Sequence, residues 1–520
     1  MGDPPLRATR RKPGCRADGT FAAVSLGLTA SLGRQQTSMV PALLYGGVAT
    51  AVVAIHLATN STLGFHTDEL YYLDSGRHPS FGYVDFPPIV PLLARLETAL
   101  LGVSPWTLRL LPSLLGGFLV ALSGTYVRRL GGLLGLQAIA LLTAAAAPFL
   151  LGSNWVFQTV TFDQVTWMVA MYWFLCLVID RRPRDWIYLG TTLGIGLEVK
   201  YTIIGLIAGI AVAVLLTPAL RLALRTKYPW IAAAIALLIW SPNLAWQVAQ
   251  GFPTLTYVTN HGGSGDGPLV YLIQFGVYFF FLIPVWLTGM VSVFRNPVLR
   301  PIGIASAVPL LVFLFGGKAY YAAGTIPVVV AQGLIAISNV RRPRLRSGLK
   351  TAAVAAAVLD FVIFFFLVVP VTPPDRIHAT RLDTVNEVFA DSVGWSDVAN
   401  QVTKIYEGLP EPERSDTVII SRYYGVPGAL QVYIDPARRP QAFSPQLSDW
   451  YWLPRNLSAT YAIMVDYRPS DVGWMCDSPA LIAHLTVPYE VMGLEQGAPV
   501  TNCPLKGSIQ SVWIHLRGFS

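Results

Sequence analysis

Apolar stretches of about 20 residues recur along the chain, and a helix of that length crosses the hydrocarbon core of a bilayer. Such stretches cover residues 39–60, 106–127, 133–151, 163–180, 229–247, 269–293, 299–316, 324–340 and 351–371. A further apolar stretch, 186–218, is too long for one crossing and is interrupted by Glu198 and Lys200. It predicts two short helices that meet near Lys200. The sequence therefore predicts about eleven membrane-spanning helices.

The composition agrees with a polytopic membrane protein. Hydrophobic residues make up 53% of the 520 residues and charged residues only 13%, and the mean hydropathy is +0.51. These values exclude an ordinary soluble enzyme of this length. The net charge is +8, but the sequence contains no basic patch interleaved with aromatic residues. Nucleic-acid binding is therefore not predicted.

Basic residues gather in alternate loops, at residues 10–12, 128–129, 181–184, 221–227, 295–300 and 341–346. Loops rich in arginine and lysine lie on the cytoplasmic side of a membrane. This alternation places the N-terminus inside the cell and the C-terminus outside. The chain is thus predicted to be a multi-pass protein of the plasma membrane, with 61–105 as its first and longest outer loop.

Three regions are expected. Residues 1–38 are basic and predict a disordered cytoplasmic tail with no cleavable signal peptide. Residues 39–372 form the mainly α-helical membrane part. Residues 373–520 predict a small outer α/β domain, because 396–409 has a helical period and 416–424, 460–467 and 511–519 have strand character. A disulfide between its cysteines, Cys476 and Cys503, fits an oxidising compartment.

The first outer loop carries an unusual group of carboxylates. The stretch FHTDELYYLDSGRHPSFGYVDFPP, 65–88, holds Asp68, Glu69, Asp74 and Asp85. A solvated acidic loop is one interpretation, and it is the preferred one for Asp74. Asp68 lies just past a span and before a rigid DFPP, and on a helix it shares a face with Tyr72. This placement is typical of a positioned base that deprotonates an acceptor hydroxyl at the membrane surface.

An ordered set of motifs resembles a known family. The motifs are FHTDELYY (65–72), GYVDFPP (82–88), TVTFDQVTW (159–167), LEVKYT (197–202), SPNLAWQVAQGFPTL (241–255), KAYYAAGTIPVV (318–329), YYGVPGAL (423–430) and the late cysteine pair. Together they resemble the bacterial glycosyltransferases of family 39, in the GT-C superfamily of protein mannosyltransferases and aminoarabinose transferases. The resemblance covers most of residues 40–520.

The resemblance implies an inverting transfer of a sugar from a polyprenyl-phosphate donor to a lipid, glycan or protein acceptor, without a cofactor. It assigns the general base to Asp68 and makes Glu69 a structural or acceptor-side partner. It places Asp163, in the second outer loop, beside them. A helix N-cap or a charge at the helix N-terminus is the alternative role for Asp163.

The donor phosphate requires cations, which stabilise its developing charge. Relatives often have a lysine before the double proline, where this chain has Asp85 and Phe86. The phosphate contact is therefore expected at Lys200 and Lys318, the latter with Tyr320 and Tyr321. The alternatives are an ion pair between Lys200 and Glu198 and, for Lys318, a snorkelling lysine in an interfacial aromatic belt.

The remaining candidates bind substrate. Asp85, Tyr72 and His78 are expected to contact sugar or acceptor hydroxyls. No metal site is predicted, because no histidine and cysteine cluster has ligand spacing. Asp68 with Asp163 as ligands of a hard divalent ion is the alternative. A transporter or flippase of lipid-linked sugars is the rival class, but the chain shows no convincing internal repeat. A sensor with an anchored outer domain would not need so many spans.

Overall fold

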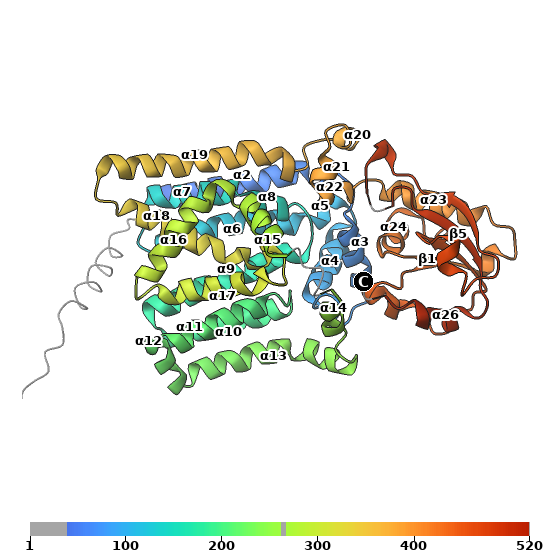
Figure 1. Ribbon diagram of the computed structural model, residues 1–520, viewed down its shortest axis with the longest axis horizontal. Coiled ribbons are helices and arrows are strands. Elements are labelled where there is room, and N and C mark those ends of the chain that lie inside the picture. Colours follow the sequence, from blue (N-terminus) through green and yellow to red (C-terminus); the bar gives the residue numbers. More distant parts are fainter. Residues whose placement is uncertain (1–38, 262–266, 494, 519–520) are drawn as a thin grey trace, which may run out of the picture. The chain divides into compact units, whose positions relative to one another are not determined.

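The computed structural model describes residues 39–261, 267–493 and 495–518 (Figure 1). The chain divides into two units between Leu43 and Leu44. Helix α2 (Met39–Thr59) begins in the first unit, and its remainder and all later elements belong to the second. The description below concerns the second unit.

Several helices have the length and composition of membrane spans. Among the described residues six helices are long and apolar enough to cross a membrane, or up to eight if each of two bent pairs counts as one span. The six are α2, α5–α6 (Pro105–Arg129), α9 (Thr159–Asp180), α13 (Tyr228–Ala249), η3–α18 (Ala319–Ser338) and α19 (Pro343–Val368). The multi-pass membrane architecture is as predicted, whereas the expected count of about eleven is not confirmed.

The other apolar segments are shorter or bent. The bent pairs are α11 (Ile203–Leu216) with α12–η1 (Pro218–Arg225) and α15 (Gly267–Tyr278) with η2–α16 (Phe280–Arg295). The shorter apolar helices are α7 (Leu134–Ala146) and α17 (Arg300–Leu314). Asp360 of α19 accepts a hydrogen bond from the backbone N–H of Phe281 at 3.3 Å. This buried carboxylate therefore satisfies a donor that the break before α16 leaves free.

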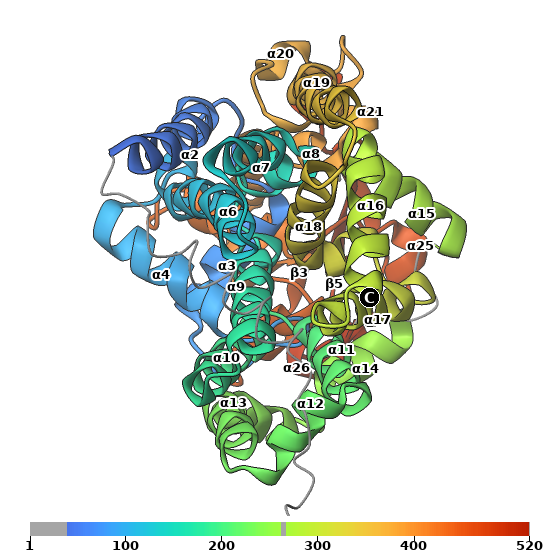
Figure 2. The same cartoon turned by 90° about the vertical axis from the view of Figure 1, so that its left-hand side faces the viewer.

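Small residues let the helices approach closely. Helix α10 (Pro183–Leu197) packs along α13, as Figure 2 shows. A Cβ atom added to Gly190 would lie 2.4 Å from the carbonyl oxygen of Ala232, and one added to Gly194 would lie 2.9 Å from the Cα of Ala236. Two glycines one turn apart are a common device for close helix contact in membranes.

The predicted break near Lys200 is confirmed. Helix α10 ends at Leu197 and α11 begins at Ile203. The N–H of Lys200 donates to the carbonyl of Gly196 at 2.9 Å, which closes the last turn of α10. Residues 198–202 thus form a short polar turn between two apolar helices.

The C-terminal region forms the predicted α/β domain. Its five-stranded sheet has the order β2-β1-β3-β5-β4. The strands are β1 (Thr417–Ser421), β2 (Ala442–Phe443), β3 (Tyr461–Val465), β4 (Ala480–His484) and β5 (Pro499–Pro504). β1 pairs in parallel with β2 and β3, and β5 pairs antiparallel with β3 and β4. Helices α23 (Trp395–Glu407) and α24 (Gly425–Tyr433) pack together beside it.

One predicted strand is wrong. Residues 511–519 were expected to be a strand, but Ile509–Leu516 form helix α26. Ser508 caps it by accepting from the N–H of Ser511, and Ile509, Val512 and Trp513 are buried. These positions follow the spacing of one helix face. The disulfide between Cys476 and Cys503 is formed, as predicted.

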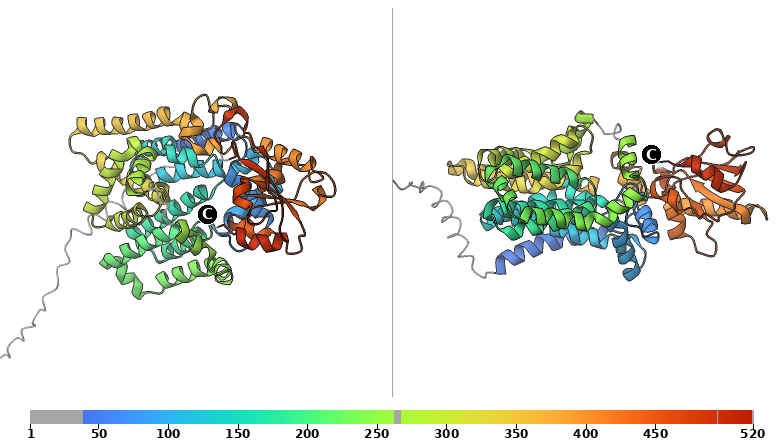
Figure 3. Two further views of the ribbon diagram at one scale, coloured as in Figure 1. Left: turned by 45° about the vertical axis from the view of Figure 1, so that its right-hand side comes forward. Right: turned by 90° about the horizontal axis from the view of Figure 1, so that it is seen from below.

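Residues 61–105, predicted above to be the first outer loop, share a hydrophobic core with the C-terminal domain. The loop contributes α3 (Thr67–Arg77) and α4 (Ile89–Leu101), and the domain contributes α23 and α24. Helices α3 and α24 lie side by side. Figure 3 shows the segment that contains α3, in blue, next to the C-terminal domain, in orange and red. A Cβ atom on Gly428 would lie 2.8 Å from the Cβ of Leu70, so glycine permits this contact. Short helices α20 (Pro374–Ile377), α21 (Leu382–Val385) and α22 (Glu387–Ala390) follow α19, and the domain boundary at 372/373 stays a prediction.

Candidate active site

The N-terminus of α3 determines where Asp68 and Glu69 point. His66 is the N-cap, and its Nδ1 accepts from the N–H of Asp68 at 3.1 Å. The carboxylate of Glu69 accepts from the N–H of His66 at 2.8 Å. This reciprocal capping turns Glu69 inward. Asp68, in the first turn, stays partly exposed.

Glu69 is fully engaged inside the protein. Its two oxygens accept from Nε and Nη2 of Arg109 at 2.8 and 2.6 Å. They also accept from the backbone N–H of Phe157 at 2.9 Å and, as above, from His66. Both partners of the Glu69–Arg109 pair are wholly buried. Of the two roles expected for Glu69, this geometry favours the structural one.

Asp68 contacts the C-terminal domain. Its Oδ1 accepts from the hydroxyl of Tyr424 at 2.8 Å. The Tyr424 ring stacks on Tyr71 with 4.3 Å between centroids. The Tyr71 hydroxyl donates to Oδ1 of Asp85 at 3.0 Å. Two stacked tyrosines therefore connect Asp68 with Asp85, two of the four carboxylates of residues 65–88.

Asp85 is held in a largely apolar setting. It lies in the loop between α3 and α4. The ring of the next residue, Phe86, contacts the rings of Tyr71 and Tyr72, with 5.2 and 5.1 Å between ring centroids. Burial raises the pKa of Asp85 to about 7, against the lowering effect of the Tyr71 hydroxyl. This carboxyl group is thus partly protonated at neutral pH.

Lys200 lies within electrostatic reach of Asp68 and Asp85. The charges of Asp163, Lys318, Asp68 and Asp85 all act on its ammonium group. Its Nζ lies 5.2 Å from the ring centroid of Tyr320 and 5.3 Å from that of Tyr321. Both distances fall within the range of cation–π contacts. The turn between α10 and α11 therefore brings a lysine to the acidic first outer loop.

Asp163 lies on the same side. It is buried in the second turn of α9, and its Oδ2 accepts from the hydroxyl of Thr202 at 2.7 Å. The N-cap of α9 is Gln158, so the alternative that Asp163 caps this helix is wrong. Asp163 instead ties α9 to the polar turn that carries Lys200.

The contacts of Lys200 and Lys318 bear on the alternative roles that the sequence left open for these two lysines. The described part of the chain contains no ion pair within 4.0 Å between Lys200 and Glu198. Glu198 is buried, and its carbonyl accepts from the N–H of Ile89 at 3.1 Å. Lys318 is exposed at the start of η3. Its nearness to Lys200 places both cations in one region.

The other two candidates separate. Tyr72 is buried one turn after Asp68, and burial together with the charges of Asp68 and Asp85 raises its pKa well above 10. His78 lies at the far end of α3, about 15 Å along the helix axis from Asp68. It stacks on Trp452 at 4.4 Å, and its Nδ1 lies 3.1 Å from the carbonyl of Asp74. The structure thus groups Tyr72 with Asp68 and leaves His78 apart.

The expectation for Asp74 is wrong. It was expected to be a solvated charge, but it is only 6% exposed. Arg77 and His78 lie 4.0 and 3.8 Å from its Oδ1. Its place on α3 faces the shared core, which no loop pattern indicates.

Sequence reasoning missed two tyrosines of the site. Tyr424 directly precedes α24, and the motif YYGVPGAL that contains it was noted without a role. Tyr257 lies on α14 (Pro253–His261), where Asp85, Tyr321 and Asp68 act on it electrostatically. Tyr424 falls within the predicted strand 416–424, and no local sequence signal places either tyrosine at the site.

No metal cluster accompanies these residues. Among residues 39–261, 267–493 and 495–518 no group of three or more histidine, cysteine, aspartate or glutamate side chains is placed to hold a metal ion. The site is therefore described by its carboxylates, lysines and tyrosines.

Comparison with known proteins agrees with this picture. Residues 85–246 match the family described as dolichyl-phosphate-mannose-protein mannosyltransferase. The fold is similar to that of ArnT from Cupriavidus metallidurans bound to undecaprenyl phosphate, with a TM-score of 0.59, 15% identity, and coverage of 90% of this chain and 98% of that chain. The chain has the GT-C fold. Its sequence motifs predicted this relationship, and the comparisons confirm it.

A second structure supports the GT-C assignment. ArnT from the same organism in the apo state matches with a TM-score of 0.57 and 15% identity, covering 89% of this chain and 97% of that chain. No curated protein matches the chain in sequence. Family match and GT-C fold together indicate a membrane glycosyltransferase.

Proposed function

We propose that this protein transfers a sugar from a polyprenyl-phosphate donor to an acceptor hydroxyl at the outer membrane face, with inversion and with Asp68 as general base. One observation supports the proposal: three segments distant in sequence bring the Asp68 carboxylate and the Lys318 ammonium group within electrostatic reach of Lys200. A base and two cations are what this chemistry needs. The similar ArnT structure was bound to undecaprenyl phosphate, which supports the donor class.

Asp68 is suited to accept a proton. The Tyr424 hydroxyl holds its Oδ1. Its second oxygen, Oδ2, receives no hydrogen bond from any residue that the structure describes, so it can accept one from an acceptor hydroxyl. As the acceptor oxygen bonds to the anomeric carbon, its proton passes to Asp68. The bond from that carbon to the phosphate oxygen breaks, and polyprenyl phosphate leaves with the electron pair.

The leaving phosphate gains negative charge during this step. Lys200 and Lys318 are the cations that stabilise it, which lowers the barrier without a general acid. The rings of Tyr320 and Tyr321 flank Lys200 and restrict where its ammonium group can lie. Their hydroxyl groups are candidates for hydrogen bonds to the phosphate or the sugar.

Asp163 acts as a positioning residue in this proposal. Its bond to Thr202 holds the turn between α10 and α11, and its charge favours the ammonium form of Lys200. Asp85 and Tyr72 lie on the Asp68 side of the site. We assign them to sugar or acceptor hydroxyls.

Location at the plasma membrane with the C-terminus outside is also proposed. The disulfide between Cys476 and Cys503 supports an oxidising compartment for the C-terminal domain. The shared core of this domain and the first outer loop supports the same side for both.

The proposal is tested with purified protein in vesicles that carry lipid-linked sugars labelled with radioactive carbon. A membrane extract supplies acceptors. We expect labelled product, release of polyprenyl phosphate and an anomeric configuration opposite to that of the donor. Labelled lipid that crosses the vesicle membrane without any product would overturn the proposal in favour of a flippase. Product with retained configuration would contradict the single-base mechanism.

A further inference from the structure

A pocket of about 490 Å³ opens in the C-terminal domain. It lies outside the site described above. Its lining includes Arg422, Gln446, Tyr467, Trp474 and His515.

The pocket sits where the topology of the sheet favours binding. Arg422 directly follows β1, Gln446 follows β2 and Tyr467 follows β3. β1 is the middle strand of this parallel set, and the chain runs first to β2 on one side and then to β3 on the other. The direction of the connections reverses at β1. Ligands of open α/β sheets bind at the carboxyl ends of the strands at such a reversal.

The C-terminal segment closes the pocket. Helix α26 supplies His515, and Gly518 just beyond it pairs with the chain after β2. The N–H of Gly518 donates to the carbonyl of Pro445 at 3.1 Å, and the N–H of Leu447 donates to the carbonyl of Gly518 at 3.0 Å. The wall opposite the sheet is therefore fixed by backbone hydrogen bonds.

Trp474 offers an accessible aromatic face. Its side chain is 51% exposed although it lines a pocket, and its ring contacts the edge of His515 at 5.9 Å. An amphipathic aromatic ring next to planar polar side chains suits a ligand with one apolar face and many hydroxyl groups. Gln446 and His515 supply the polar groups.

The arginine in the pocket is neutralised. Arg422 pairs with Asp466 at 3.1 Å and with Asp471 at 3.2 Å. Its guanidinium also lies 4.3 Å from the Tyr467 ring centroid. Two carboxylates balance one cation, so an anionic ligand would gain little here. A neutral ligand is favoured.

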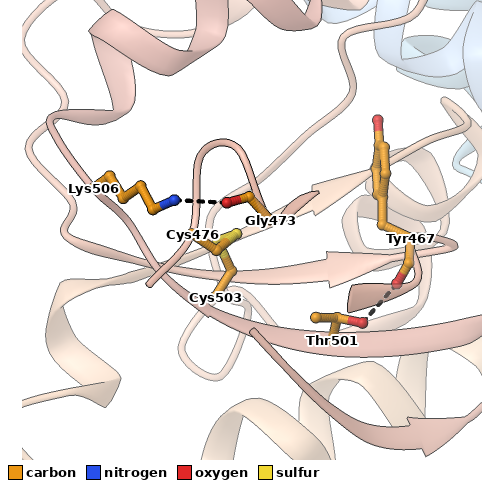
Figure 4. The surroundings of a disulfide bond; sticks show 6 residues. All are labelled: Tyr467, Gly473, Cys476, Thr501, Cys503 and Lys506. Carbon is orange, nitrogen blue, oxygen red and sulfur yellow. Dashed lines mark hydrogen bonds between the residues drawn. A yellow bond between two sulfur atoms is a disulfide. The ribbon is translucent and has the colours of Figure 1, made fainter. Parts of the chain in front are cut away.

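The loop that carries Trp474 is anchored on both sides, as Figure 4 shows. The disulfide holds Cys476, and the ammonium of Lys506 donates to the carbonyl of Gly473 at 2.6 Å. The carbonyl of Tyr467 accepts from the hydroxyl of Thr501 at 2.6 Å. Pre-ordering of a site lowers the entropy that binding must overcome.

The pocket is also connected to the candidate active site. The side-chain oxygen of Gln446 accepts from the N–H of Tyr424 at 3.4 Å. The hydroxyl of the same Tyr424 donates to Asp68. One residue therefore contacts the pocket with its backbone and the proposed base with its side chain.

We infer that this pocket binds a neutral sugar unit of the acceptor. The inference rests on the proposed function, because it takes the acceptor of that transfer to be a glycan or glycolipid. Trp474 stacks on the sugar face, while Gln446 and His515 bind its hydroxyl groups. The pocket holds the acceptor away from the reacting atoms and has no part in the chemistry.

Saturation-transfer NMR on the full chain in lipid nanodiscs tests this inference. Maltoside detergents are avoided, because their head group is itself a neutral sugar. The probes are methyl glycosides of glucose, mannose, galactose, arabinose and N-acetylglucosamine, with glucuronate and glucose 6-phosphate for comparison. Trp474→Ala and His515→Ala are compared with Ile514→Ala, a matched change at a 67% exposed neighbour on α26.

We expect at least one neutral glycoside to bind wild type, Ile514→Ala and Asp68→Asn equally. Trp474→Ala should weaken that binding by about tenfold or more, and Trp474→Phe less. No signal from any neutral glycoside, an undiminished signal in Trp474→Ala, or binding of the anionic sugars alone would overturn the inference. Asp68→Asn changes the proposed base and keeps the pocket, so its binding is measured independently of sugar transfer. If wild type binds a neutral glycoside but transfers no sugar, the proposed function is refuted and the pocket assignment stands.

Discussion

Tyr424 and Asp68 are 356 positions apart in the sequence and are joined by a hydrogen bond of 2.8 Å. The Tyr424 hydroxyl donates to Oδ1 of Asp68. In the proposed mechanism, Oδ2 accepts the proton of the acceptor hydroxyl. In the proposed mechanism Tyr424 is thus a positioning residue for the base. Its stacking on Tyr71 connects it to the second carboxylate, Asp85.

Tyr424→Phe removes this hydroxyl and keeps the ring. We expect kcat to fall about tenfold, the value of one hydrogen bond to a charged group, with KM for the donor unchanged. Steady-state kinetics checks this split. Tyr423→Phe, one residue earlier, is the matched control and should leave both constants unchanged. A rise in donor KM with kcat intact would contradict the positioning role.

Asp85 should make stability depend on pH. Burial raises its folded-state pKa to about 7, above the unfolded value of about 4. The folded state therefore binds the proton more tightly, so the stabilising contribution is complete below about pH 4 and is lost as the pH rises to about 7. Asp85→Asn cannot ionise. Thermal unfolding midpoints should show wild type losing stability relative to this variant between pH 5 and 8. Parallel midpoints across this range would be inconsistent with the raised pKa.

At the scale of elements, α3 separates its two adjacent carboxylates. Reciprocal capping at His66 turns Glu69 toward Arg109, whose guanidinium also donates to the carbonyl of Asn60 at the end of α2 at 2.7 Å. The pair therefore joins α2, α3 and the start of α6. Asp68, on the other face, remains available for chemistry.

Glu69→Gln should damage the fold more than the site. Arg109 would become a buried charge without a counter-ion, which lowers the free energy of unfolding by about 3–5 kcal/mol. Detergent-induced unfolding in mixed micelles measures this. The double variant Glu69→Leu with Arg109→Met removes both charges and should regain much of that stability. A stable Glu69→Gln protein that has lost activity would instead indicate a direct catalytic role.

Local sequence signals predicted some elements and not others. The polar residues of LEVKYT inside an apolar stretch predicted the turn that carries Lys200, because a lysine there requires an interruption of the span. Residues 511–519 were taken for a strand, although Ser508 and the spacing of Ile509, Val512 and Trp513 specify a helix. The contact of α3 with α24 has no local signal, so the roles of Tyr424 and the burial of Asp74 could not be predicted.

At the scale of the whole molecule, the candidate site depends on the joint core of the first outer loop and the C-terminal domain. The membrane helices supply Asp163 and the turn with Lys200, and the outer domain supplies Tyr424. Each part alone lacks a group that the mechanism uses. This arrangement requires that the first outer loop and the C-terminal domain lie on the same side of the membrane.

Cysteine labelling checks the sidedness. Asn400→Cys on α23 and Ser347→Cys on α19 both introduce exposed thiols. A membrane-impermeant maleimide should label Asn400→Cys in intact cells and Ser347→Cys only after lysis. Cys15→Ala and Cys176→Ala in both backgrounds remove the two cysteines that lie outside the Cys476–Cys503 disulfide. The reverse labelling pattern would invert the topology and place the site in the cytoplasm.

The central claim is tested most directly by the single-turnover rate of sugar transfer at saturating donor. Asp68→Asn should lower this rate about 100-fold or more, because it removes the general base, while polyprenyl phosphate binding stays at the wild-type level. Asp375→Asn, an exposed acid at the start of α20, should match wild type. A folded Asp68→Asn protein that transfers sugar at the wild-type rate would contradict the account.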